Sequence, residues 1–249
     1  MKINSIERCL KVIDTLSDHP AGLKLTEISR LLDLHPSSVH HMVSTLLPNN
    51  YISQDSDTKK YSLGFRFLEI SRKILDNLDI RRIANRHLVV LRQKCQEAVH
   101  LAILRDDKVV YIDKLDTPSG LSLATYVGFA TEPHAAAGGK VLLAGLKDEA
   151  IKGIYKNKTL KGYGKNTITR LPALMAELAR IRKQGYAVDN EEYYEGVRCV
   201  AAPVRSGGQV VASISVTGSI FTMTQGRIEK KLAAAVVKAA DSVSAELKW

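Results

Sequence analysis

Long apolar runs and paired cysteines are both missing from this sequence of 249 residues. No run of apolar residues is long enough to cross a membrane, and none near the N-terminus resembles a signal peptide, so we expect neither a membrane nor a secreted protein. The cysteines, Cys9, Cys95 and Cys199, are odd in number and lack metal-ligand spacing. The sequence therefore predicts a cytoplasmic protein with reduced thiols, without a metal site and without a cofactor.

The N-terminal third of the chain lacks any net charge. Residues 1–79 carry ten basic and ten acidic side chains, whereas residues 80–249 carry 26 and 16 and so hold the whole formal charge of +10. A strongly basic chain often binds nucleic acid, but here the excess lies away from the segment described next. A prediction of DNA binding must therefore rest on a motif. The length and a hydrophobic fraction of 45% allow two globular domains.

Residues 25–64 have the pattern of two short helices, a tight turn between them and a hairpin. Thr26 is a candidate cap for the first helix, and Pro36 suits the first turn of the second. The segments 51–53 and 61–63 have the pattern of the two hairpin strands. This order predicts a winged helix-turn-helix, in which the second helix enters the DNA major groove. A preceding helix over 6–16 is expected to complete the core, with the apolar residues Ile6, Cys9, Leu10, Ile13 and Leu16, and Ile28, Leu31 and Leu32 from the next helix.

The buried face of the second helix leaves polar side chains pointing outward, where short donors can approach phosphates and base edges. The candidate DNA-binding residues are Thr26, Ser37, Ser38, His40, His41, Ser44 and Thr45, with Lys59 and Lys60 of the hairpin. The alternative interpretation is a three-helix structural module with a surface hairpin.

The rest of the chain predicts an α+β domain. Residues 1–64 form the winged helix-turn-helix domain and 65–79 a linker helix, which packs against a second copy or within one subunit. Residues 80–249 form an effector-binding and oligomerisation domain with a largely antiparallel sheet and flanking helices. The expected helices are 80–96, 140–146, 149–155, 169–184 (capped by Thr169 and ended by Gly185) and 224–249, and the expected strands are 99–104, 109–115, 121–124, 132–134, 186–189, 197–204 and 210–217.

Three separated blocks resemble the IclR family of bacterial transcriptional regulators. The first is LTEISRLLDLHPSSVHHMVSTL with the following YSLG, the second EPHAAAGGKVLLAGL, and the third GYAVDNEEYYEGVRCVAAPV followed by VVASISVTG. The resemblance implies a winged helix-turn-helix, a linker helix and a GAF-like effector domain. It also implies dimers, or dimers of dimers, that repress or activate catabolic genes.

The resemblance further implies an effector site at Ala136, Ala137, Gly138, Asp189, Cys199, Ser215 and Thr217. Free backbone N–H groups at a helix start near Gly138 suit a carboxylate, and the side chains suit a hydroxyl or keto oxygen. The competing interpretations are structural: Cys199 is a small buried residue, Ser215 and Thr217 face solvent, Glu191 and Glu192 lie on the surface or cap a helix, and His134 is a structural histidine.

Two positions depart from the family pattern. His41 stands where the family usually has arginine, and Ala135-Ala136 where a hydroxyl residue is common. An imidazole lacks the bidentate grip of arginine on guanine or phosphate. The two alanines shift the expected ligand toward a more apolar acid.

The leading hypothesis is a ligand-responsive regulator, not an enzyme, that binds a palindromic operator in double-stranded DNA and senses a small organic acid, aromatic or keto acids included. One alternative is an enzyme with Cys199 as nucleophile and His134 or Asp189 as its partner, although no nucleophile signature is present. A second alternative is a constitutive DNA-binding protein whose C-terminal domain only dimerises, and a closed pocket filled by side chains would favour it.

Overall fold

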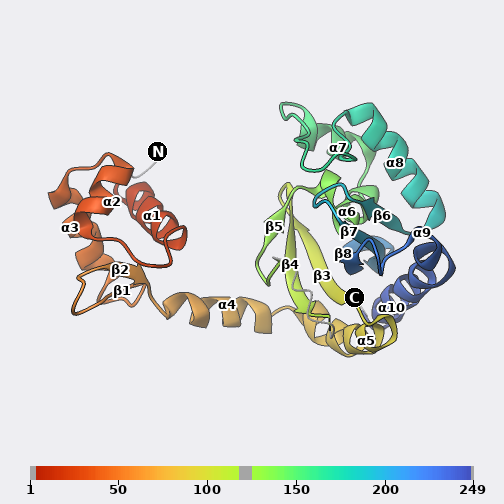
Figure 1. Ribbon diagram of the computed structural model, residues 1–249, viewed down its shortest axis with the longest axis horizontal. Coiled ribbons are helices and arrows are strands. Elements are labelled where there is room, and N and C mark those ends of the chain that lie inside the picture. Colours follow the sequence, from red (N-terminus) through yellow and green to blue (C-terminus); the bar gives the residue numbers. More distant parts are fainter. Residues whose placement is uncertain (1–3, 118–124, 248–249) are drawn as a thin grey trace. The chain divides into compact units, whose positions relative to one another are not determined.

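The computed structural model describes residues 4–117 and 125–247 (Figure 1). The chain separates into two compact units, 1–77 and 78–249, and each is described by itself. Within the described ranges no helix is long and apolar enough to cross a membrane.

The first unit is a winged helix-turn-helix, as predicted. Its core lies between three helices and a two-stranded antiparallel wing, and includes Val12, Ile28 and Val39, all fully buried. The wing strands pair from Ile52 opposite Leu63 to Gln54 opposite Tyr61. In chain order the elements are α1 (Asn4–Ser17), α2 (Leu25–Leu32), α3 (Pro36–Leu46), β1 (Ile52–Gln54), β2 (Tyr61–Leu63) and α4 (Arg66–Asp76).

The helix starts differ in one respect from the prediction. Thr26 is the second residue of α2 and not its cap, because the extended residue before the helix is Lys24. Leu23 exchanges two backbone hydrogen bonds with Tyr61, which keeps the chain extended up to Lys24. The Lys24 N–H donates to the Glu27 carboxylate at 2.7 Å. Pro36 begins α3 as predicted.

Some apolar residues of the first unit are exposed. Ile6, Leu10 and Leu31 were expected in the core but are 56%, 55% and 49% exposed, because Val12, Leu16 and Ile28 fill the small interior instead. The helix α4 contains no buried residue. Phe65 and Leu68 are 80% and 64% exposed.

The second unit is built on one antiparallel sheet of six strands, which confirms the predicted α+β class (Figure 1). The order across the sheet is β5-β4-β3-β8-β7-β6, so the two long hairpins β3-β4 and β7-β8 meet at its centre. Gly207 and Gly208 adopt positive φ in the tight turn of the second hairpin. The strands are β3 (Ala98–Arg105), β4 (Lys108–Leu115), β5 (Ala130–Thr131), β6 (Ala187–Asn190), β7 (Val197–Ser206) and β8 (Gln209–Ser219).

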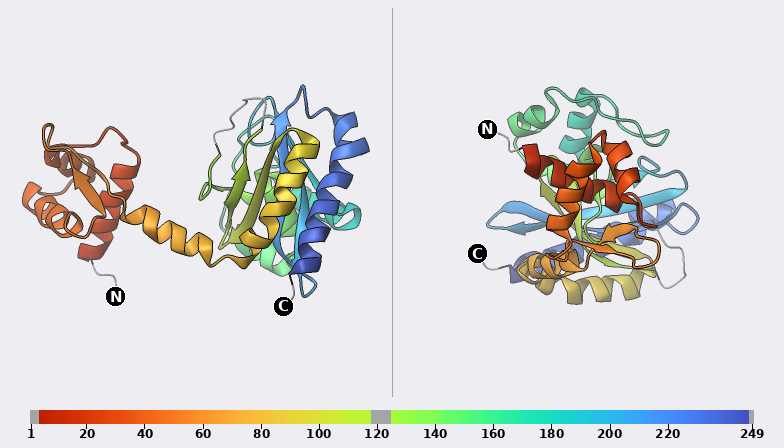
Figure 2. Two further views of the ribbon diagram at one scale, coloured as in Figure 1. Left: turned by 90° about the horizontal axis from the view of Figure 1, so that it is seen from below. Right: turned by 90° about the vertical axis from the view of Figure 1, so that its left-hand side faces the viewer.

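Helices cover both faces of this sheet (Figure 2). On one face α5 (Asp79–Cys95) and α10 (Ala233–Glu246) lie side by side over a core that includes Leu88, Val200 and Val236. On the other face lie α6 (Ala137–Ala144), α7 (Asp148–Tyr155) and α8 (Leu171–Gln184), over a second core with Val141, Leu174 and Ala201. The short α9 (Gln225–Arg227) and a π-helical turn (Ile228–Leu232) lead into α10.

Three boundaries in this unit were predicted wrongly. The expected strand 132–134 is absent: β5 ends at Thr131, and Pro133–Ala135 form a 3-10 turn because proline has no N–H for a strand ladder. The cap of α8 is Arg170 rather than Thr169. The helix α6 begins at Ala137, three residues before the expected start. The predicted strand 121–124 lies outside the described residues.

Candidate DNA interface and effector site

The polar residues of α3 form an open surface. Ser37, His40, His41, Ser44 and Thr45 are exposed and Ser38 is half-buried. Two of the hydroxyls already have local partners. Ser37 Oγ lies 2.8 Å from His35 Nδ1, and Thr45 Oγ1 donates to the carbonyl of His41 at 2.9 Å. Thr26 is exposed on α2, the helix before.

The tip of the wing is held by a carboxylate. Asp55 Oδ1 accepts hydrogen bonds from the backbone N–H groups of Asp57 and Thr58 and from the Thr58 hydroxyl. The bond from the Thr58 hydroxyl is the main reason that the pKa of Asp55 lies below its usual value. Lys59 is exposed at the tip and Lys60 is half-buried. The wing therefore presents one open cation in a fixed turn.

A residue that the sequence analysis missed lies beside α3. Arg8 of α1 lines a hollow of about 480 Å³ together with Ser38, His41 and Thr45. An arginine is a side chain able to bind phosphate, and α3 itself contains neither arginine nor lysine. The sequence showed only a polar helix side at this point, without a pattern that ties it to α3.

In the second unit the seven residues of the implied effector site line one cavity. Ala136, Ala137 and Gly138 come from the start of α6, and four side chains come from the sheet. Asp189 lies opposite Cys199 in the ladder of β6 and β7, and Cys199 lies opposite Thr217 in the ladder of β7 and β8. Ser215, on the same face, is two residues before Thr217. Sheet register thus brings together side chains from three strands, and the start of α6 lies against them.

Further lining residues were not predicted. The most informative is His100 of β3, which is opposite Ser215 and 2% exposed. Its Nε2 lies 3.0 Å from Thr125 Oγ1, while its Nδ1 is buried without a hydrogen bond among the described residues. Burial, with a smaller contribution from the charge of Lys114, lowers the pKa of His100 to about 4. The other unpredicted lining residues are Tyr111, Thr125, Thr131, Tyr193, Tyr194 and Val197, and Phe129 lines the cavity as the sequence predicts for an apolar wall.

The electrostatics of the cavity are those of a buried acid. None of the lining residues that the structure describes is a lysine or arginine. Asp189 is 3% exposed, and its Oδ1 accepts the backbone N–H of Glu192 at 2.7 Å. Burial, followed by the charge of Glu192, raises the pKa of Asp189 to about 7. At neutral pH the carboxyl is therefore partly protonated and able to donate a hydrogen bond.

An ion pair of two buried side chains lies directly behind Asp189. Lys140 of α6 is 1% exposed; its Nζ donates to the Val188 carbonyl at 2.7 Å and to Glu192 Oε1 at 2.5 Å. The prediction that Glu192 lies on the surface or caps a helix is therefore wrong: it is 6% exposed and neutralises the lysine. This pair ties the helix whose start lines the cavity to the strand that carries Asp189.

The structure decides two of the competing interpretations. Ser215 and Thr217 are 6% and 7% exposed, so they do not face solvent. His134 is buried, with its Nε2 2.9 Å from the Lys161 carbonyl and its ring against Tyr155, and it is not among the residues that line the cavity. Its Nδ1 is buried without a hydrogen bond among the described residues, and its place outside the cavity favours the structural interpretation.

The cavity itself is nearly filled. Its open volume is about 30 Å³, which is the share of one water molecule in the liquid. Any larger ligand has to move the walls apart. Tyr194, which is 39% exposed, is the most exposed large side chain around it.

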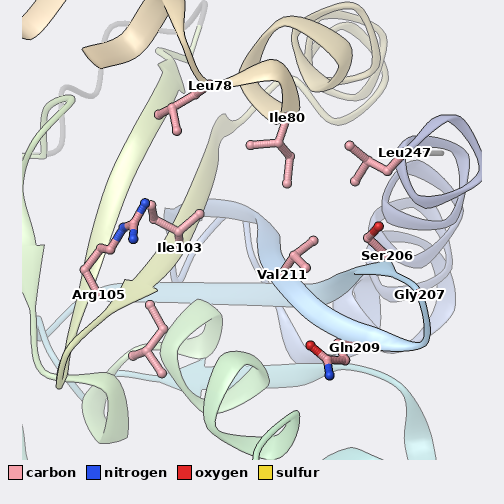
Figure 3. Close-up of a pocket in the computed structure, with 10 residues that line it drawn as sticks. Leu78, Ile80, Ile103, Arg105, Ser206, Gly207, Gln209, Val211 and Leu247 are labelled. Carbon is pink, nitrogen blue, oxygen red and sulfur yellow. The ribbon is translucent and has the colours of Figure 1, made fainter. Parts of the chain in front are cut away.

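A much larger hollow of the second unit lies elsewhere (Figure 3). Its volume is about 590 Å³, and its wall is mostly apolar, with Ile80, Ile103, Val211 and Leu247. It lies where β3 and β8, paired only as far as Ala102 opposite Ser213, diverge (Figure 3). No residue of the implied effector site lines it.

Comparison with known proteins assigns both parts of the chain to one family. Residues 5–56 match the model of the IclR helix-turn-helix domain, and residues 72–245 match that of the bacterial transcriptional regulator IclR C-terminal domain. The chain is 34% identical to the HTH-type transcriptional regulator XynR of Escherichia coli (strain K12) over 216 residues, which cover 86% of each protein.

Solved structures agree with these matches. The Thermotoga maritima IclR structure has a TM-score of 0.83 at 28% identity and covers all of both chains. An IclR homologue from Microbacterium hydrocarbonoxydans, complexed with 4-hydroxybenzoate, has a TM-score of 0.84 at 24% identity and covers 98% of both. The chain therefore belongs to the IclR family of bacterial transcriptional regulators.

Proposed function

We propose that this regulator binds a palindromic operator as a homodimer, or as a dimer of dimers, and that a small organic acid in the cavity of the second unit controls its affinity for DNA. The observation that carries the proposal is the convergence of Ala136–Gly138, Asp189, Cys199, Ser215 and Thr217 on one buried cavity. As a regulator of chromosomal genes it would act in the bacterial cytoplasm.

On the DNA side, α3 is the recognition helix and Lys59 of the wing contacts phosphate. Ser38, His40, His41 and Ser44 are the side chains most available for base edges, since Ser37 and Thr45 have local hydrogen bonds. His41 gives a weaker contact than the arginine usual in the family, and Arg8 beside it compensates on the phosphate backbone.

Dimerisation is supported by the exposed apolar residues of the first unit. Phe65, Leu68 and Ile74, in and next to α4, are each more than half exposed. Phe65 and Leu68, three positions apart, lie on one side of the helix, and exposed apolar side chains grouped in this way mark a protein contact. A second copy that covers them would set the distance between two α3 helices, and a two-fold axis calls for a palindromic operator.

The effector would place its carboxylate at the start of α6, where the first backbone N–H groups have no partner within the helix. A hydroxyl or keto group would reach Asp189, Ser215 or Thr217. The Microbacterium homologue was crystallised with a hydroxylated aromatic acid. By binding one dimer arrangement better than another, such an acid changes the affinity for the operator.

The geometry gives little support to an enzyme. Burial, and next the charge of Asp189, raises the pKa of the Cys199 thiol well above its ordinary value. Because the thiolate is the reactive form, Cys199 is a poor nucleophile. His134, its candidate base, bonds to a backbone carbonyl outside the cavity. We therefore place Cys199 in the effector site as a contact residue.

The nearly filled cavity favours one other function, a constitutive DNA-binding protein whose second unit only dimerises. Against it stand buried polar atoms that lack hydrogen bonds among the described residues, namely His100 Nδ1 and Thr131 Oγ1 in the cavity wall. Such atoms cost about 1–3 kcal/mol each unless they are satisfied. A polar ligand between them would remove that cost.

The test is to incubate the purified protein with sheared genomic DNA from its host and to sequence the retained fragments. We expect enrichment of a palindromic site that is lost in a Ser38→Ala/His41→Ala variant. A Lys152→Ala variant, changed at an exposed position of α7, is the matched control and should retain the site. Equal retention without sequence preference in all three proteins would overturn the proposed function.

A further inference from the structure

A second cavity lies on the far side of β6 from the effector site. Its volume is about 310 Å³, ten times that of the effector cavity. It is bounded by α8, the free edge of β6 and the α9 segment, and Lys140 and Glu192 lie at its inner end. Nothing in the proposed function uses it.

The inner end of this cavity is charged and deeply buried. Lys140 and Glu192 are 1% and 6% exposed. Glu192 Oε2, the oxygen that does not bond Lys140, is buried and accepts no side-chain hydrogen bond in the described part of the chain, and the backbone N–H of Asn190 lies beside the same carboxylate. Glu177, 4.0 Å from Lys140 Nζ, is itself held by Arg180. The inner end of the cavity, which holds the carboxylates of Glu192 and Glu177, therefore offers an acceptor oxygen to an N–H donor of a ligand.

The outer part of the cavity carries two charges of opposite sign without ionic partners. Arg198 donates to Asn190 Oδ1 at 2.6 Å and to the Met223 carbonyl at 3.4 Å, and makes no ion pair with any described residue. Glu229 accepts only the amide of Gln225, at 2.9 Å, among the described side chains. A guanidinium and a carboxylate that face one opening suit a ligand that carries both charges.

The remaining wall is apolar. Ile168, Val188 and Ile228 line the same space, and Ile228 is 2% exposed. A ligand that satisfies the charged groups therefore also has a place for an aliphatic side chain. The volume lies within the range of pockets that hold small ligands.

We propose that this cavity binds a small zwitterion of the aliphatic α-amino-acid class. Its carboxylate pairs with Arg198 and its ammonium with Glu229 in the outer part of the cavity, and its side chain packs on Val188 and Ile228. Because the backbone N–H of Glu192 holds Asp189 in place, an occupant here touches the residue pair that supports the effector site. The proposal stands without the proposed function.

The test measures direct binding to the full protein without DNA, by calorimetry with L-valine, L-leucine and L-isoleucine. Two fragments of leucine are the ligand controls: 4-methylpentanoate lacks the ammonium and 3-methylbutylamine lacks the carboxylate. We expect saturable binding of at least one amino acid, and at least about tenfold weaker binding of both fragments, since each loses one charge pair.

Variants then assign the site. Arg198→Gln and Glu229→Gln should each weaken the amino acid about tenfold, whereas Arg205→Gln, an exposed change on the same strand as Arg198, should leave it unchanged. Glu229 is exposed, so its variant folds independently of any effect at Arg198. No saturable binding up to about 10 mM, a weak limit for a specific ligand, would overturn the proposal. Binding that is equal in all three variants would overturn it as well.

Discussion

The two candidate sites of this chain are built in opposite ways. Most of the candidate DNA-binding residues lie on the surface of one helix of eleven residues, and their hydrogen bonds are with neighbours in sequence. The effector cavity is buried, and its side chains come from α6 and several strands, held by the ladders between them. Substitutions in the exposed site should therefore change the unfolding free energy little. Substitutions around the buried cavity disturb core packing and should lower the stability of the second unit.

The largest loss of unfolding free energy is expected on substitution of Lys140, which belongs to the buried ion pair. Lys140→Met leaves Glu192 as an uncompensated buried charge, so we expect the second unit to lose about 3–5 kcal/mol of unfolding free energy. Urea unfolding followed by circular dichroism measures it. Lys152→Met, at an exposed position of α7, is the control. A loss below about 1 kcal/mol, the range of a surface pair, would show that the pair is not needed.

Two glycines of the second unit differ in how much space surrounds them. A Cβ on Gly139, at the start of α6, would lie 2.3 Å from the Pro133 carbonyl oxygen, so Gly139→Ala should cost about 1–3 kcal/mol by overpacking. Gly153 lies in α7 with nothing within 4 Å. Gly153→Ala should therefore stabilise by about 0.4–1 kcal/mol. Thermal unfolding of both variants is the measurement, and shifts of the same sign would contradict the packing described for α6.

Asp189 should give the buried site a pH dependence. Its pKa of about 7 lies above the value of 3.8 expected in the unfolded chain, so the folded state keeps a proton that the unfolded state has released. The contribution of this proton to stability is present at low pH and is lost as the pH rises from about 4 to about 7.

Asp189→Asn removes that titration. The melting temperature of the variant minus that of the wild type should therefore increase between about pH 5 and pH 8, by roughly 2–4 °C for each kcal/mol involved. A control substitution that changes no titratable group, Gly153→Ala in α7, should show no such trend. A difference for Asp189→Asn that is flat or falls with pH would contradict the buried, raised pKa.

The smallest effect is expected on the exposed helix. His41→Arg adds one cation to α3 beside Arg8, and should strengthen DNA binding with little change in stability. The slope of log affinity against log salt should become steeper by about 0.9, the value for one more phosphate contact. Fluorescence anisotropy at several salt concentrations measures it. An unchanged slope would place His41 away from the DNA backbone.

The same contrast explains what the sequence could predict. Local patterns were sufficient for the winged helix-turn-helix and for Pro36 at the start of α3. Local patterns failed where the position of a residue depends on contacts with helices or strands distant in sequence. Thr26 does not cap α2 because Leu23 pairs with Tyr61, and Glu192 is buried because Lys140 reaches it from α6.

The cavity shows the same limit. The resemblance to the family supplied seven residues that the structure brings together, but His100 and Tyr111 carry no local signal. Whether a strand residue faces a packed core or a cavity is decided by the helix above it, and alternation along the strand gives the face alone. Arg8 was missed for a similar reason, since only the packing of α1 beside α3 brings it to the DNA-facing surface.

The most direct test of the regulator as described is its response to an effector on its own operator. With a DNA fragment retained from the host genome, operator affinity is measured in the presence of each organic acid handled by the enzymes encoded beside it. We predict that one acid changes the affinity of the wild type at least about tenfold, the lower range of allosteric coupling. Ser215→Ala should keep the affinity without acid and lose the response. An equal response in Ser215→Ala and wild type, or none to any of these acids, would contradict the account.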